Sequence, residues 1–154
     1  MNLRLLAKIL GLLCLLLSAV QLGCVAYGYA VGGEIENQAA WALVQSFALG
    51  AAVGLGLLYA GRHTGDEVSR REAIAVVGLG WIMSGLLGAI PYMLSEPRLG
   101  PVDAWFESVS GFTTTGSTVI ADLDPVPRCL LLWRGLTQWL GGLGILVMFV
   151  ALLS

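Results

Sequence analysis

The stretch DAWFESVSGFTTTGS, residues 103–117, decides the architecture of this chain. It begins as a short helical segment and continues into a threonine-rich turn that contains Gly111 and Gly116. Long apolar segments lie on both sides of it. A polar, non-helical backbone beside such segments is tolerated only where protein buries it or where it lines water. We therefore expect this stretch to enter the membrane as a loop.

The composition indicates a membrane protein. The chain has 154 residues, of which 57% are hydrophobic and only 12% are charged, whereas soluble domains carry roughly a quarter charged residues. The formal net charge of −2 is too small to indicate nucleic acid as a partner. Cys14, Cys24 and Cys129 lie in or beside apolar segments without the spacing of a zinc site. We expect them to act as small apolar side chains.

Four apolar segments are long enough to cross about 30 Å of hydrocarbon, and we expect them at residues 9–30, 39–60, 73–94 and 129–153. A signal peptide is the alternative for the first segment, because basic residues precede it. Its length and the lack of an A-x-A-like cleavage site favour a retained helix. Glycines that permit close helix packing recur in the other three segments, at Gly50, Gly54, Gly56, Gly78, Gly80, Gly141, Gly142 and Gly144, and Gly85 and Gly88 lie in the third segment as well.

A half-length helix is expected at residues 102–110. Pro101 suits the first helical turn, and Asp103 and Glu107 place negative charge near the positive N-terminal end of the helix. A helix of this length spans about 13 Å, roughly half of the bilayer core. The sequence therefore predicts an all-α integral membrane protein with four transmembrane helices and one re-entrant half-helix pore loop.

The charges divide between the two sides of the predicted membrane. Most acidic residues lie in the links at residues 31–38 and 95–128, whereas the basic residues before the first segment and in the second link are Arg4, Lys8, Arg62, Arg70 and Arg71. Basic links are typically cytoplasmic, so both ends of the chain are expected in the cytoplasm. The acidic outer links either raise the local cation concentration or only solubilise that face. The single histidine, His63, lies in the basic link, where its context assigns it no role.

The threonine run suits coordination of a cation by backbone carbonyls. Threonine is β-branched and favours an extended chain, while Gly116 can adopt angles that turn an adjacent carbonyl toward an axis. Several such carbonyls can replace the water around a potassium ion. The negative C-terminal end of the half-helix further favours a cation. A serine- and threonine-rich turn without a ligand is the alternative.

Two blocks of sequence resemble the Trk-type potassium transporters, the TrkH/KtrB group. They are DAWFESVSGFTTTGSTVI (residues 103–120) and LLLWRGLTQWLGGLGILV (residues 130–147). The resemblance implies two leading helices and a cytoplasmic loop at residues 1–72, then the first of four helix–pore-loop–helix units at residues 73–154. It implies potassium transport across the cytoplasmic (inner) membrane. The filter would use the carbonyls of Thr114, Thr115, Gly116 and Ser117, supported by Glu107, Gly111, Thr113 and Arg134.

The resemblance also implies which ligands and partners to expect. Potassium is the transported ion and the filter is the only cation site, with no cofactor and no enzymatic activity. A cytoplasmic nucleotide-binding regulatory subunit and a homodimer are the expected protein partners, beside the lipid bilayer. Neither the transport mode, channel-like or symport, nor the selectivity follows from one pore unit. Because one loop cannot surround an ion, the chain is either a fragment, which we favour, or one of several assembled copies.

An ion pair is expected between Glu107 and Arg134, which lie at similar depth. A buried arginine is costly and is usually paired, so the pair would brace the half-helix against the fourth segment. In the alternative, Arg134 extends toward the surface or bonds carbonyls.

Two other functions remain as alternatives. A membrane assembly or anchor protein without transport predicts that a bulky residue at Gly116 has no effect. A membrane enzyme with a serine or threonine nucleophile needs a base nearby, and His63 is expected on the opposite face.

Overall fold

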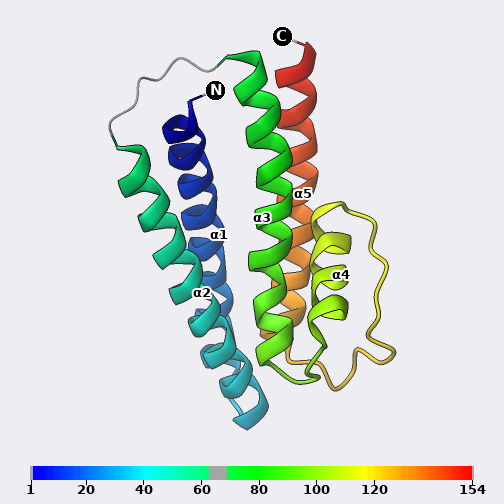
Figure 1. Ribbon diagram of the computed structural model, residues 1–154. Coiled ribbons are helices and arrows are strands. Elements are labelled where there is room, and N and C mark those ends of the chain that lie inside the picture. Colours follow the sequence, from blue (N-terminus) through cyan, green and yellow to red (C-terminus); the bar gives the residue numbers. More distant parts are fainter. Residues whose placement is uncertain (1, 63–68, 154) are drawn as a thin grey trace.

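The computed structural model describes residues 2–62 and 69–153, with side chains at all of these except residue 70 and residues 147–153. Every regular element in the described ranges is an α-helix (Figure 1). The helices are α1 (Leu3–Val31), α2 (Glu34–Gly61), α3 (Arg70–Leu94), α4 (Pro101–Phe112) and α5 (Arg128–Leu153). His63 lies outside the described residues.

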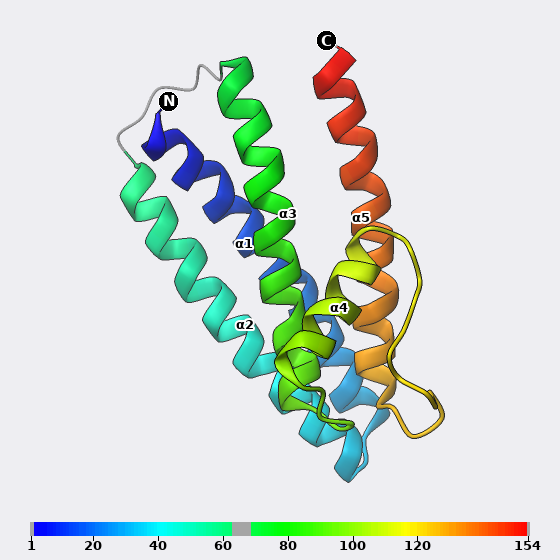
Figure 2. The ribbon, with the colours of Figure 1, turned by 45° about the vertical axis from the view of Figure 1, so that its right-hand side comes forward.

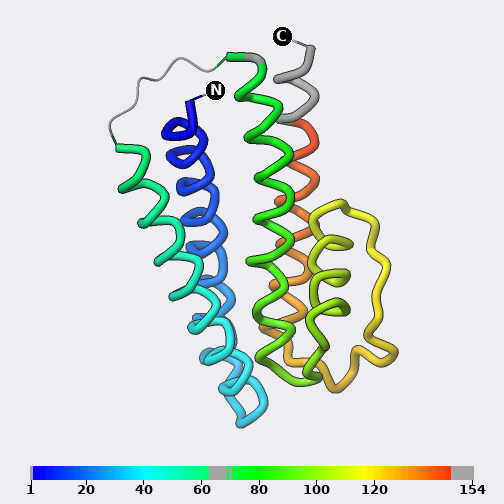
Figure 3. Tube along the Cα trace, in the orientation of Figure 1, coloured from blue at the N-terminus to red at the C-terminus, as the bar shows by residue number. Residues whose placement is uncertain are grey.

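The first two helices form an antiparallel hairpin, and both begin earlier than their apolar segments (Figure 3). The Asn2 side chain caps α1 by accepting hydrogen bonds from the backbone N–H groups of Arg4 and Leu5, at 3.2 and 3.3 Å. In α2 the first turn carries Glu34 and Glu36, whose charge suits a helix N-terminus. The Asn2 cap and the acidic first turn of α2 thus stabilise helix starts that lie before the apolar stretches at 9–30 and 39–60.

Small residues let the two helices of the hairpin approach closely. A Cβ at Gly11 would lie 2.8 Å from the Gly54 carbonyl oxygen, and one at Gly50 would lie 2.5 Å from the Ser18 hydroxyl. The packing role predicted for Gly50 and Gly54 is confirmed. A Cβ at Gly56 or Gly78, in contrast, would meet nothing within 4 Å, so the prediction that these two glycines serve helix packing is wrong within this chain.

Three of the described helices are long and apolar enough to cross a membrane: α1, α2 and the Arg71–Leu94 part of α3. The fifth helix, α5, has 26 residues, and its length of about 39 Å exceeds the hydrocarbon thickness. The chain is therefore an all-helical protein of the membrane type.

The second unit consists of α3, α4 and α5. Figure 2 shows α4 between α3 and α5, with the loop that follows it on the outer side. Residue Pro101 starts α4 and Phe112 ends it, two residues beyond the predicted end. With 12 residues, α4 is about 18 Å long. The chain then returns to the end of the molecule at which α4 began (Figure 1), as a re-entrant loop does.

The two ends of the molecule differ in charge. The start of α1, the end of α2, the start of α3 and the end of α5 lie at one end, and the α1–α2 link, the start of α4 and the start of α5 lie at the other (Figure 1). The first of these, here called the basic end, carries Arg4, Lys8, Arg62 and Arg71. The opposite, acidic end carries Glu34, Glu36, Glu96, Asp103, Asp122 and Asp124 beside Arg98 and Arg128.

One apolar core joins the hairpin to the second unit. The three cysteines are buried and form no disulfide, and Cys24 and Cys129 belong to this core, as expected of small apolar side chains. The core draws on all five helices, and its members are Cys24, Ala39, Leu43, Ala89, Tyr92, Ala104, Ile120, Val126, Cys129, Leu130 and Trp133.

A carboxylate at the start of α2 caps the N-terminus of α5. The backbone N–H groups of Arg128 and Cys129 donate to the two Glu36 carboxylate oxygens, at 2.6 and 3.2 Å. Hydrogen bonds from a helix N-terminus to a charged carboxylate are among the stronger ones. This contact fixes the start of α5 relative to the leading hairpin.

Replacing Glu36 by glutamine should lower the stability of the intact protein by about 1–2 kcal/mol, because the amide has no charge and only one acceptor oxygen for the two helix N–H groups. Thermal unfolding in detergent, followed by circular dichroism, measures the change. The matched control is Glu34→Gln, which removes the same charge from an exposed position in the same helical turn. Equal effects of the two substitutions would contradict the capping role.

Candidate functional site

The half-helix α4 lies against α3 through two glycines. A Cβ at Gly85 would come within 3.0 Å of the Val109 side chain, and one at Gly88 would meet the Ser108 hydroxyl and the Phe112 ring. The Trp133 indole N–H donates to the Gly88 carbonyl at 3.2 Å. Because these two glycines of α3 have no side chains, α4 can pack closely against α3 at this point.

The same helix is held on its other side by α5. A Cβ at Gly141 would overlap the carbonyl group of Phe112, and a Cβ at Gly111 would meet the hydroxyl of the fully buried Thr137. The rings of Phe112 and Trp133 stack edge to face, with centroids 6.5 Å apart. The end of α4 is therefore placed by backbone contacts as well as by side chains.

The chain leaves α4 through a wound turn. The backbone N–H groups of residues 114–116 point back to the carbonyls of Gly111 and Ser110, at 2.9 to 3.4 Å. Thr114 has φ 57° and Gly116 has φ 76°. Positive φ was expected at Gly116, but a β-branched residue rarely adopts it, and such strain tends to collect at functional sites.

Hydroxyl groups hold this turn on both sides. The Thr113 hydroxyl donates to the Val109 carbonyl at 2.8 Å and lies 2.9 Å from the Thr115 hydroxyl. The Ser110 hydroxyl donates to the Ser117 carbonyl at 2.5 Å. Sequence reasoning missed this role of Ser110, and its position at the predicted end of the half-helix, six residues before Gly116, was the only signal.

The expected ion pair between Glu107 and Arg134 is present. The Arg134 Nε lies 2.7 Å from Glu107 Oε1, and the Glu107 side chain is completely buried. The second carboxylate oxygen, Oε2, accepts from the Thr118 hydroxyl at 2.9 Å and from the Val119 N–H at 3.1 Å. One carboxylate thus ties α4 both to α5 and to the loop that leads away from the turn.

Arg134 also reaches the turn itself. Its Nη2 donates to the Gly116 carbonyl at 3.1 Å, so the bonding of a carbonyl, offered as an alternative to the ion pair, occurs together with it. Two of the four predicted ligand carbonyls, at Gly116 and Ser117, therefore each accept one hydrogen bond from the protein. A carbonyl oxygen has two lone pairs, so each keeps one for another partner.

The predicted ligand residues share one exposed face. Residues 113–119 are all exposed in this chain, and they lie on the side of α4 away from the α1–α2 hairpin (Figure 1). The turn therefore exposes backbone and hydroxyl oxygens on one face of the molecule. An ion that needs oxygens all around it requires further donors opposite.

Comparison with known proteins finds a matching family and several similar proteins. Residues 39–154 match the family described as TrkH: Cation transport protein. The chain is 40% identical over 156 residues to the Trk system potassium uptake protein TrkH of Escherichia coli (strain K12), covering 99% of this chain and 31% of that protein. It is 45% identical over 82 residues to TrkI of Halomonas elongata, covering 53% of this chain and 17% of that protein.

A solved structure is similar along almost the whole chain. The crystal structure of the potassium transporter TrkH from Vibrio parahaemolyticus matches with a TM-score of 0.86 and 35% sequence identity. The match covers 99% of this chain and 32% of that one. The chain thus spans about a third of the length of these TrkH relatives.

Proposed function

The chain belongs to the family of TrkH cation transport proteins, and from this premise we propose that it forms the first pore unit of a potassium transporter. The backbone carbonyls of Thr114, Thr115, Gly116 and Ser117 coordinate potassium as it crosses. The observation that carries the proposal is a helix of 12 residues that ends inside the molecule and is followed by a returning loop with an exposed, oxygen-rich turn.

The electrostatics of the turn support cation binding. The C-terminal end of α4, which carries partial negative charge, lies directly before the turn. The buried Glu107 carboxylate neutralises the guanidinium of Arg134, which would otherwise repel a cation beside the Gly116 carbonyl. The support role proposed for Gly111 and Thr113 rests on the Thr137 contact and on the hydroxyl bonds of the turn.

The remaining ligands come from outside residues 1–154. The TrkH relatives are about three times as long as this chain, and the four-unit plan that the sequence resembles supplies three more loops. Residues 1–72 form the leading hairpin with its link, and residues 73–154 form the pore unit. The relatives are named as uptake proteins, and we assign no catalytic step and no cofactor to this chain.

The membrane arrangement follows from the charged ends. We place α5 as the fourth transmembrane helix and α4 as the re-entrant half-helix of a protein in the cytoplasmic (inner) membrane. The basic end faces the cytoplasm, in keeping with the usual bias of lysine and arginine. A nucleotide-binding regulatory subunit would contact that end, and a homodimer is the proposed assembly.

The proposal is tested by Gly116→Asp in the intact transporter, expressed in bacteria that lack other potassium uptake. Aspartate at a left-handed position distorts the turn and adds a side chain to the ion path. Potassium uptake should fall about tenfold or more.

The matched control is Gly32→Asp in the link between α1 and α2. Gly32 has φ 72°, close to the φ 76° of Gly116, and a Cβ at either glycine meets nothing within 4 Å. Both substitutions place an aspartate at a positive φ, but only one of them touches the filter. Normal uptake by the Gly116 variant would instead support an assembly or anchor protein without transport.

A further inference from the structure

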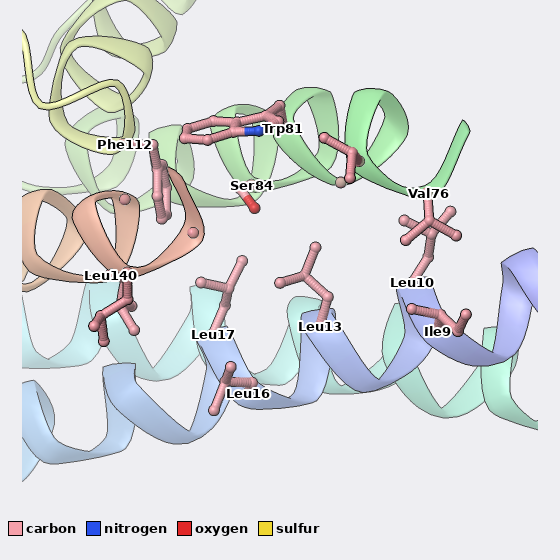
Figure 4. Close-up of a pocket in the computed structure, with 15 residues that line it drawn as sticks. Ile9, Leu10, Leu13, Leu16, Leu17, Val76, Trp81, Ser84, Phe112 and Leu140 are labelled. Carbon is pink, nitrogen blue, oxygen red and sulfur yellow. The ribbon is translucent and has the colours of Figure 1, made fainter. Parts of the chain in front are cut away.

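An apolar groove of about 420 Å³ lies between α1, α3 and α5. Figure 4 shows Leu13 and Leu17 of α1 opposite Trp81 and Ser84 of α3, with Phe112 and Leu140 at one end. Phe112 is the last residue of α4, so whatever fills the groove touches the end of the half-helix.

The lining determines what chemistry the groove accepts. Apart from the Ser84 hydroxyl and the Trp81 indole N–H, its side chains are aliphatic or aromatic. Apolar cavities of this kind remain dry, and they offer no ligands for a potassium ion. A hydrocarbon chain fits this surface.

The position of the groove sets the direction of such a chain. Along α1 the lining runs from Ile9 to Leu17, a length of about 12 Å, within a helix that is long and apolar enough to cross a membrane. It begins little more than one turn from Arg4, and along α3 it begins at a similar distance from Arg71. The groove therefore leads from the basic end toward the middle of the molecule.

Charge at the basic end favours an anionic headgroup. Glu72, the carboxylate nearest to this end of α3, already accepts hydrogen bonds from the Asn2 N–H at 2.5 Å and the Ser69 hydroxyl at 2.7 Å. Among the described residues at this end of α1 and α3, the guanidinium groups of Arg4 and Arg71 outnumber this one carboxylate. Basic clusters beside transmembrane helices attract anionic lipid headgroups.

We propose that this groove binds one acyl chain of an anionic phospholipid, whose headgroup lies at the basic end beside Arg4 and Arg71. The bound chain packs against Phe112 and so supports the end of α4. The groove lies between α1, α3 and α5, whereas the loop that follows α4 lies on the side of α4 away from the hairpin (Figure 1). Pore units that complete the filter therefore approach from the other side. The proposal goes beyond conduction and does not depend on it.

The first test counts retained lipid in the intact protein by native mass spectrometry after detergent extraction from membranes. A Cβ at Gly80 would lie 3.2 Å from the Leu13 side chain, whereas one at Gly78 would meet nothing within 4 Å. Gly80→Leu should therefore reduce the retained phospholipid about tenfold, and the matched control Gly78→Leu should retain it. A second variant, Gly144→Leu, fills the groove from α5, since a Cβ there would lie 3.9 Å from Trp81. It should reduce the retained phospholipid as Gly80→Leu does, and it keeps the test decisive if Gly80→Leu folds poorly.

The second test identifies the occupant and its charge. Phosphatidylglycerol with a photoactivatable acyl chain, supplied in vesicles, should crosslink to peptides that contain Leu13 and Trp81, about tenfold more than the same phosphatidylcholine probe. Arg4→Gln combined with Arg71→Gln should abolish this preference, while Arg98→Gln at the acidic end should preserve it.

Three outcomes would overturn the proposal. The first is that wild type, Gly80→Leu and Gly144→Leu retain equal amounts of lipid. The second is that the two probes crosslink equally. The third is that another protein segment occupies the groove, so that the probes label other peptides. None of these readouts measures transport, so they are independent of the potassium uptake assay.

Discussion

Replacing Gly141 by alanine should displace the half-helix from α5. The alanine Cβ would overlap the Phe112 carbonyl oxygen and lie 2.6 Å from its carbonyl carbon. Backbone cannot rotate away as a side chain can, so we expect a loss of stability of about 3 kcal/mol or more, at the upper end for overpacked sites. Thermal unfolding of the intact protein in detergent measures the loss, and potassium uptake should fall with it.

The matched control for this substitution is Gly135→Ala on the same helix. A Cβ at Gly135 meets nothing within 4 Å, and the position is exposed. Because alanine favours helix more than glycine by about 1 kcal/mol, this control should be neutral or stabilising. An equally stable Gly141→Ala protein would mean that α4 and α5 are not in contact at this point.

The second large effect is expected from Glu107→Gln. Glu107 is buried and pairs with Arg134, whose side chain is only 18% exposed. Removing one partner of a buried pair leaves the other charge uncompensated and typically costs about 3–5 kcal/mol. Loss of the carboxylate also frees the positive charge of Arg134 beside the Gly116 carbonyl, so potassium uptake should fall more than protein level does. Uptake per molecule of transporter in the membrane separates the two effects.

Two variants control for the loss of a carboxylate and for the unpaired charge. Asp103→Asn removes a charge from an exposed position on the same helix and should change stability little. The double variant of Glu107→Gln with Arg134→Gln contains no unpaired buried charge and should recover part of the lost stability. If Glu107→Gln alone were as stable as Asp103→Asn, the pair would not brace the half-helix.

Much of the fold could be predicted because it depends on local properties. Runs of apolar residues indicated the positions of α1, α2, α3 and α5, and the proline before residues 102–110 indicated the start of α4. The helix ends were less accurate: α1 begins at Leu3 and α2 at Glu34. Caps and acidic first turns extend a helix beyond its apolar part, so a search for apolar residues alone places these ends too far inside.

The candidate site was predictable in part. The Glu107–Arg134 pair could be inferred because both residues occupy a similar depth, and a buried charge needs a partner. The contacts of Glu107 with Thr118 and Val119, and that of Arg134 with the Gly116 carbonyl, were not foreseen. The positive φ at Thr114 was missed as well, since nothing local requires it of a β-branched residue.

The sequence by itself determined that this protein is of the membrane type and that one of its helices is too short to cross the hydrocarbon, because the length of an apolar or helical run can be compared directly with the thickness of the hydrocarbon. Only the tertiary structure decided that Gly141 contacts the Phe112 carbonyl, that Glu36 caps α5, and that a groove leads from the basic end to Phe112. These contacts join separate helices over a few ångströms. They depend on how each helix is rotated about its own axis and on the angle at which it crosses its neighbours, and the spacing of residues along one helix does not specify either.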